Sequence, residues 1–283
     1  MENNQFKFST HDGLSLFGRI WLSTAKDIRG VVKLVHGIGE HSGRYAHIGK
    51  ALNKRGYHLA SFDLRGHGLS DGKRGFSPSL NHLMDDIDLF LHESQDKLGQ
   101  DLPVFLYGHS LGANLVLNFG LRRKPNVSGV IATGTSFAFA FEPPKFKLFL
   151  GKILAKVWPS CTMSNELDQN ALSRDQAIVK AYQDDVFVHD RISARLVTDI
   201  IESGQFALNH AEDWTLPLLL MHGTADRITS SQASEEFAKR SSPYTELVLY
   251  DGCYHEIHND FNKEEVIEKM IGWLNERTAL QLT

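Results

Sequence analysis

The sequence predicts an α/β protein with a mostly parallel, doubly wound sheet and a helical cap inserted between two of its strands. Two observations support this prediction. Short, continuous apolar runs alternate with segments of helical period, as expected for strands buried on both faces and linked by helices. This alternation stops after residue 134 and resumes after residue 213. We therefore expect a core made of residues 1–134 and 214–283, and a cap made of residues 135–213.

The first half of the chain begins with a hairpin and continues with alternating strands and helices. Apolar runs on either side of Asp12-Gly13 predict the hairpin, because Asp-Gly favours a tight turn. Continuous apolar runs then predict strands at residues 31–35, 58–62, 104–107 and 127–132. Apolar residues at helical spacing predict helices at residues 45–54, 80–97 and 111–121.

The cap and the last part of the chain differ in their periodicity. Within the cap, helices are expected at residues 145–157, 175–182 and 193–203. Beyond it, strands are expected at residues 218–221 and 245–250, and helices at residues 231–240 and 263–277. The regular alternation in this last part places its two strands in the same parallel sheet as the first half.

Composition excludes several classes of protein. The 283 residues carry a formal net charge of -4, which argues against a nucleic-acid-binding surface. No apolar run reaches the roughly 18 residues needed to span a membrane, and the polar N-terminus lacks a signal-peptide core. The two cysteines, Cys161 and Cys253, are far apart and in no metal-ligand spacing. We expect a cytoplasmic protein without a metal site, with a single disulfide as the open alternative.

The strongest functional signal is the Gly-x-Ser-x-Gly pattern formed by Gly108, Ser110 and Gly112. It lies between the apolar run 104–107 and the helical run 111–121, so the chain must reverse within a residue or two. Glycines two residues before and after the serine let the strand and the helix approach closely. The serine is then exposed at the tip of the turn, as a nucleophile requires. The alternative is an ordinary glycine-containing turn between a strand and a helix.

A serine hydroxyl needs a base to take its proton, usually a histidine oriented by a carboxylate. In doubly wound sheets such groups lie beyond the carboxyl ends of the strands. Asp226 follows the strand at 218–221, and His255 follows the strand at 245–250. The order Ser110, Asp226, His255 is the one this architecture uses. We expect these three residues to form the catalytic triad.

Other polar residues near the strand ends have structural interpretations. Asp251 is expected to shape the turn that carries His255, and four further residues are expected to order loops through hydrogen bonds: His36, Asp63, His67 and His109. His258 lies one helical turn after His255 and is a candidate substrate contact.

An oxyanion hole requires two backbone donors. One is expected from the N–H of Leu111, the residue after the nucleophile, and the other from the N–H of Ile38 in the loop after strand 31–35. Gly37 and Gly39 allow that loop to turn inward.

These motifs together make the sequence resemble the monoacylglycerol lipases and lysophospholipase-like members of the α/β-hydrolase superfamily. The resemblance covers nearly the whole chain and is most specific in the segments HGIGEHSGRY (36–45), GHGLSDG (66–72), LYGHSLG (106–112), GTADR (223–227) and YHEIH (254–258). It implies a hydrolase core with a helical cap over an apolar acyl tunnel. It also implies the same triad and oxyanion donors.

The resemblance implies further substrate contacts. The polar pocket on the glycerol side corresponds to Glu40, Arg44 and His258, and the tyrosine of the cap to Tyr182. A charged pair offers both donors and acceptors to hydroxyl groups. The alternative for Glu40 and Arg44 is an ion pair that joins the oxyanion loop to the next helix, and both roles are compatible.

We therefore expect a serine hydrolase that cleaves carboxylic esters through an acyl-enzyme and requires no cofactor. The first-choice reaction converts monoacylglycerol, a small lipid ester, to glycerol and free fatty acid. A lysophospholipase or a broad-specificity carboxylesterase is the alternative. A scaffold without turnover is disfavoured because all three triad positions are filled. The sequence carries no prediction of oligomeric state.

The helix expected at residues 145–157 is amphipathic and basic. Phe146, Phe149, Leu150, Ile153 and Val157 share one face, and lysines lie on another. Such a helix suits transient contact of the cap with a membrane surface, which would make the protein peripheral. The alternative, which we favour for most of the helix, is that the apolar face packs against the core.

Overall fold

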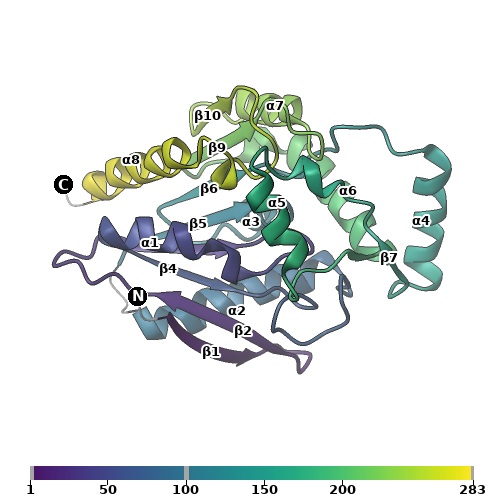
Figure 1. Ribbon diagram of the computed structural model, residues 1–283, viewed down its shortest axis with the longest axis horizontal. Helices are drawn as coiled ribbons and strands as arrows, with labels where there is room; N and C mark the ends of the chain where they lie inside the picture. Colours follow the sequence, from purple (N-terminus) through teal and green to yellow (C-terminus); the bar gives the residue numbers. More distant parts are fainter. Residues whose placement is uncertain (1–2, 99–101, 282–283) are drawn as a thin grey trace.

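The computed structural model describes residues 3–98 and 102–281. It contains an eight-stranded sheet in the order β1-β2-β4-β3-β5-β6-β9-β10 (Figure 1). The bounds of its strands are β1 Asn3–Ser9, β2 Ser15–Trp21, β3 Gly30–Val35, β4 Tyr57–Phe62, β5 Val104–His109, β6 Gly129–Thr133, β9 Leu218–Gly223 and β10 Thr245–Tyr250. β1 and β2 form the predicted hairpin, β2 pairs antiparallel with β4, and all other neighbours are parallel. The predicted class, a mostly parallel α/β sheet, is confirmed.

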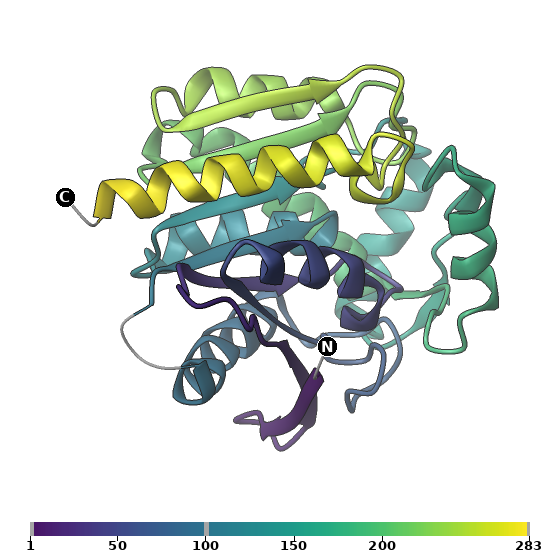
Figure 2. The same cartoon turned by 60° about the vertical axis from the view of Figure 1, so that its left-hand side comes forward.

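Helices cover both faces of the sheet. On one face lie α1 (Ala46–Lys54) and α8 (Lys263–Gln281), which share a buried apolar cluster with the strands (Figure 2). On the other face a second cluster joins the strands to α2 (Leu80–Leu98), α3 (Leu111–Arg123) and α7 (Ser231–Arg240). Strands β3, β4 and β6 are buried along their whole length, which explains their mainly apolar sequences. Lys33 of β3 is an exception, and its buried amine donates to the carbonyl of Leu91 at 2.6 Å.

The segment between β6 and β9 is mainly helical, with α4 (Lys145–Val157), α5 (Gln176–Asp184) and α6 (Ala194–Asn209). It also contains a short antiparallel pair, β7 (Thr162–Ser164) with β8 (Arg191–Ser193), which the sequence did not predict. Helix α6 contributes buried apolar side chains such as Leu196 and Ile200 to the same cluster as α2, α3 and α7. The division into a core and a separate cap therefore stays a prediction.

Helix α4 corrects one expectation. Its apolar side chains face outward: Phe146 and Phe149 are each 68% exposed and Val157 is 79% exposed. The helix packs against α6 and buries Ala155, while Figure 1 shows it at the side of the molecule. The interpretation that its apolar face packs against the core is wrong, because that face is exposed. Within the described residues, no helix has the length and apolarity required to cross a membrane.

Candidate active site

The turn between β5 and α3 places Ser110 in a conformation that few non-glycine residues adopt. Its φ is 54° and its ψ is -115°, and its N–H donates to the carbonyl of Thr133 at 2.9 Å. Such a backbone costs about 1–3 kcal/mol and persists only where the surroundings enforce it. Gly112 explains the tightness of the turn, because a Cβ there would lie 1.9 Å from the carbonyl oxygen of Val35. The chain reversal expected from the motif is present.

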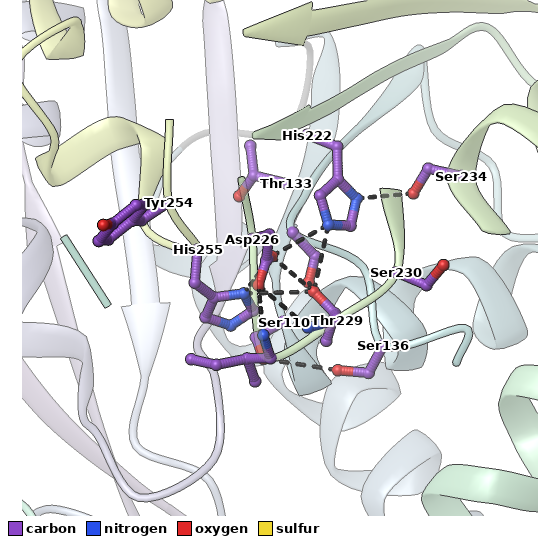
Figure 3. A network of polar contacts seen from close by, with 12 residues as sticks. Ser110, Thr133, Ser136, His222, Asp226, Thr229, Ser230, Ser234, Tyr254 and His255 are labelled. Atoms are coloured by element: carbon purple, nitrogen blue, oxygen red, sulfur yellow. Dashed lines mark hydrogen bonds and ion pairs between the residues drawn. The ribbon is translucent and has the colours of Figure 1, made fainter. Parts of the chain in front are cut away.

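Two loops at the carboxyl ends of β9 and β10 bring Asp226 and His255 to this turn (Figure 3). His255 Nδ1 donates to Asp226 Oδ2 at 2.7 Å, and both side chains are almost fully buried. Ser110 Oγ lies 3.4 Å from Ser136 Oγ, its hydrogen-bond partner. Ser110 and His255 line the same cavity, and catalytic hydrogen bonds are often loose in the absence of substrate.

The electrostatics of this group suit a histidine that accepts a proton. Burial by itself lowers the pKa of His255, but the Asp226 carboxylate outweighs burial and the pKa is raised. Burial raises the pKa of Asp226, yet its contacts with His255 and His222 hold that pKa well below the usual range. Asp226 therefore stays ionised, and its negative charge favours the protonated form of His255.

The loop after β3 reaches the same cavity. Gly37, Ile38 and Glu40 line it together with Ser110 and His255. The N–H of Gly37 donates to Glu40 Oε1 at 2.7 Å and is thus occupied. Ile38, the next residue of the loop, also lines the cavity, and Leu111 lies at the first turn of α3, where helical N–H groups have no partner within the helix.

Glu40 and Arg44 form the ion pair that the sequence left as one of two interpretations. Arg44 Nη1 donates to Glu40 Oε2 at 2.7 Å, and the same guanidinium holds Glu256 through two further bonds of 2.7 Å. All three side chains are 10% exposed or less. Burial alone would raise the pKa of Glu40, but Arg44 keeps it lowered. Glu40 also accepts from the hydroxyl of Tyr45 at 2.7 Å, so the pair joins the loop to the 3₁₀ helix Ser42–Tyr45 that precedes α1.

Of the four expected substrate contacts, two line the cavity and two do not. Tyr182 and Glu40 line the cavity, and Arg44 lies over the Tyr182 ring at 4.7 Å. Arg44 and His258 are not among its lining residues. His258 is buried, stacks on Tyr45 with 5.2 Å between ring centroids, and lies 4.6 Å from the ring of His109. It therefore supports the wall of the site from behind.

Glu256 and His222 were not predicted from the sequence as residues of this site. Glu256 lines the cavity and holds Arg44, and His222 lies 3.0 Å from Asp226. Their positions, one residue from His255 and four residues before Asp226, were visible in the sequence, but no spacing rule assigns them a partner.

The loop-ordering roles are confirmed by contacts. His36 Nε2 accepts from the N–H of Leu64 at 2.9 Å, and His109 Nδ1 lies 3.0 Å from Thr133 Oγ1. Asp63 accepts from the N–H groups of Ser42 and Leu69, and His67 Nδ1 contacts the carbonyl of Arg65. Asp251 accepts from Thr224 Oγ1 in the turn before His255. Both cysteines are free, and no cluster suited to a metal ion occurs within residues 3–98 and 102–281.

A family model described as serine aminopeptidase, S33, matches residues 26–262. The chain belongs to this family. A monoacylglycerol lipase from Mycolicibacterium smegmatis is 30% identical over 96% of each chain. The monoglyceride lipase of Homo sapiens is 28% identical over 95% of this chain and 89% of its own. An uncharacterized abhydrolase domain-containing protein from Dictyostelium discoideum is 37% identical over 95% of this chain, which spans 28% of that protein.

Solved structures give the same result for the fold. The crystal structure of the Paleococcus ferrophilus monoacylglycerol lipase superposes with a TM-score of 0.83 at 35% identity, over 98% of this chain and all of that one. A soluble variant of the Saccharomyces cerevisiae monoglyceride lipase gives 0.85 at 25% identity, over 97% of this chain and 94% of that one. The α/β-hydrolase fold and the family are thus confirmed. The chain is a hydrolase, and its relatives support one that acts on esters.

Proposed function

We propose that the chain is a serine hydrolase of lipid esters that converts monoacylglycerol to glycerol and free fatty acid. The observation that carries this proposal is the buried His255–Asp226 pair, whose His255 lines a cavity together with Ser110 and with both apolar and acidic side chains. Leu167, Leu172 and Ile228 supply apolar lining for an acyl chain, while Glu40 and Glu256 supply acceptors for hydroxyl groups.

In the proposed reaction, Ser110 Oγ attacks the ester carbonyl while His255 Nε2 takes its proton. Asp226 orients the imidazole through Nδ1, and the N–H groups of Ile38 and Leu111 stabilise the oxyanion. His255 then protonates the departing glycerol oxygen, leaving Ser110 acylated. The same imidazole next takes a proton from water, which attacks the acyl-enzyme and releases the fatty acid. No cofactor enters these steps.

The charge of the cavity favours a neutral head group over a phosphate. Glu40, Arg44 and Glu256 together carry a net charge of -1, since two carboxylates share one guanidinium. Because both carboxylates line the cavity, they would repel an anionic phosphodiester, and this repulsion is strong at the low dielectric of a buried site. Glycerol hydroxyls can instead donate to the free carboxylate lone pairs. This observation supports monoacylglycerol ahead of lysophospholipid, the alternative substrate.

A release assay across monoacylglycerols and lysophospholipids of several chain lengths tests the substrate. We expect faster fatty-acid release from monoacylglycerols, and no release by Ser110→Ala. The catalytic role of Ser110 is tested separately with a fluorophosphonate probe, which should label the wild type and not the variant. A clear preference for lysophospholipids would overturn the substrate, and unchanged labelling of Ser110→Ala would overturn the mechanism.

We further propose that the cap meets a lipid surface through α4. Its outward face carries Phe146, Phe149, Leu150, Ile153 and Val157, each at least 42% exposed, and Lys152 and Lys156 are exposed beside it. Apolar side chains can enter the acyl boundary while lysines meet anionic head groups. The wild type should bind anionic liposomes more tightly than the Phe146/Phe149/Ile153→Ser variant. Tyr244→Ser, which removes an exposed ring outside the cap, is the control, and equal binding by all three proteins would refute the contact.

A further inference from the structure

The Asp226 carboxylate is shared by two histidines, and the proposed reaction uses only one of them. Oδ2 lies 2.7 Å from His255 Nδ1, 2.8 Å from Thr229 Oγ1 and 3.0 Å from His222 Nε2 (Figure 3). Oδ1 accepts from the N–H groups of Ile228 and Thr229 at 2.7 and 3.0 Å. His222 is the last-but-one residue of β9, so it comes from the rigid sheet and not from the loop that carries Asp226.

The contacts of His222 show which of its ring nitrogens carries a hydrogen. An ionised carboxylate can only accept, so the Nε2 that faces Asp226 must carry a hydrogen. On the opposite side of the ring, Nδ1 lies 2.8 Å from the hydroxyl of Ser234, which can donate to it. Both side chains are fully buried. In the tautomer with its hydrogen on Nε2, Ser234 donates to His222 and His222 donates to Asp226.

We propose that His222 is a positioning residue that sets how strongly Asp226 holds the proton of His255. This inference rests on the proposed function, since it assigns His255 as the general base. A donor on the carboxylate draws negative charge away from the bond to His255, and burial makes the effect larger than in water. Without His222, the carboxylate would hold the imidazolium more firmly. His255 would then stay protonated, and inactive as a base, up to a higher pH.

Other charged groups near His255 do not share the geometry of His222. The ring of His109 lies 4.9 Å from that of His255, and Glu256 and Glu40 act on it through space, as His258 does. These groups come from the end of β5, the segment after β10 and the loop after β3. None of them contacts Asp226 Oδ2, whereas His222 and Thr229 do. Replacing His222 therefore changes the carboxylate and leaves the other charges in place.

The test is the pH dependence of kcat/KM on a water-soluble ester such as p-nitrophenyl butyrate. In His222→Leu, which removes the donor, the acidic limb should move upward by about half a unit to one unit. His222→Gln, whose amide can still reach the carboxylate, should restore most of the wild-type profile. Met221→Leu is the matched control, because it alters a buried residue of the same strand without touching Asp226.

Several outcomes would overturn the inference. An unchanged acidic limb in a folded His222→Leu does so, and so does an equal shift in His222→Gln or Met221→Leu. If His222→Leu does not fold, His222→Asn replaces it, because the asparagine amide is one bond too short to reach the carboxylate. An unchanged acidic limb in His222→Asn would likewise overturn the inference. Full activity of Ser110→Ala would instead overturn the proposed function, so the two failures are distinguishable.

Discussion

Replacing Arg44 should destabilise the protein far more than replacing any exposed arginine. Arg44 holds Glu40 and Glu256 through three bonds of 2.7 Å, and these side chains are 10% exposed or less. Arg44→Met keeps the length of the side chain and leaves two buried carboxylates facing each other. Removing one partner of a buried pair typically costs about 3–5 kcal/mol, because the remaining charge is uncompensated. We expect a loss in this range in urea unfolding at pH 7.5.

The same variant should lose less stability at lower pH. In the wild type Arg44 lowers the pKa of Glu256 against the effect of burial, so the pair stabilises the fold above the unfolded pKa of about 4.5. In Arg44→Met the guanidinium that opposed the effect of burial is gone. Burial then raises the pKa of at least one of the two carboxyls above its unfolded value. That carboxyl takes up a proton as the pH falls, which removes the cost of its charge. The difference from wild type should therefore shrink between pH 7.5 and pH 5.

Arg55→Met is the matched control for this experiment. Arg55 pairs with Glu268 at 3.0 Å, but the two side chains are 52% and 60% exposed. An exposed pair contributes about 0–1 kcal/mol. The loss of unfolding free energy in Arg44→Met should exceed that in Arg55→Met and should depend on pH. If it does neither, Arg44 does not stabilise the fold by pairing with the buried carboxylates of Glu40 and Glu256.

Two further predictions concern turnover. Asp226→Asn should lower kcat for monoacylglycerol by about 10⁴-fold, because the imidazole loses both its orientation and its counter-charge, and a loss below about tenfold would contradict the role of Asp226. Gly39→Ala should lower kcat by about 10- to 100-fold with little change in KM. The added Cβ would lie 2.5 Å from the carbonyl oxygen of His189 and would displace the proposed donor of the adjacent Ile38. Steady-state kinetics measure this effect, and an unchanged kcat would contradict it.

Elements buried on both faces were predictable because burial constrains their sequence directly. The parallel strands are mainly apolar, and the turn at Ser110 needs glycines at fixed positions for steric reasons. The positions of Asp226 and His255 followed from the rule that parallel strands end at one edge of the sheet. Predicted strand and helix ends differ from the observed ones by a few residues; α6, for example, continues to Asn209.

Features that depend on contacts between distant segments were not predictable. An amphipathic pattern shows that α4 has an apolar face, but it does not show what covers that face, and the side chains of Phe146 and Phe149 are exposed. The three-residue strands β7 and β8 are too short to have a recognisable period. Glu256 acquires its role only where Arg44 arrives from another part of the chain. His222 contacts Asp226 only four residues further on, but that contact depends on how the intervening turn folds.

The contacts between the helical segment and the oxyanion loop restrict how the cavity can open. The N–H of His189 donates to the carbonyl of Gly39 at 2.9 Å, and His41 Nε2 lies 2.9 Å from Asp185 Oδ2. Residues 185–189 thus hold the loop that carries Ile38, so under the proposed function their displacement would also disturb the proposed oxyanion donor. Helix α4 has no part in these contacts and packs against α6. A displacement of α4 at a lipid surface would therefore leave the catalytic loop in place.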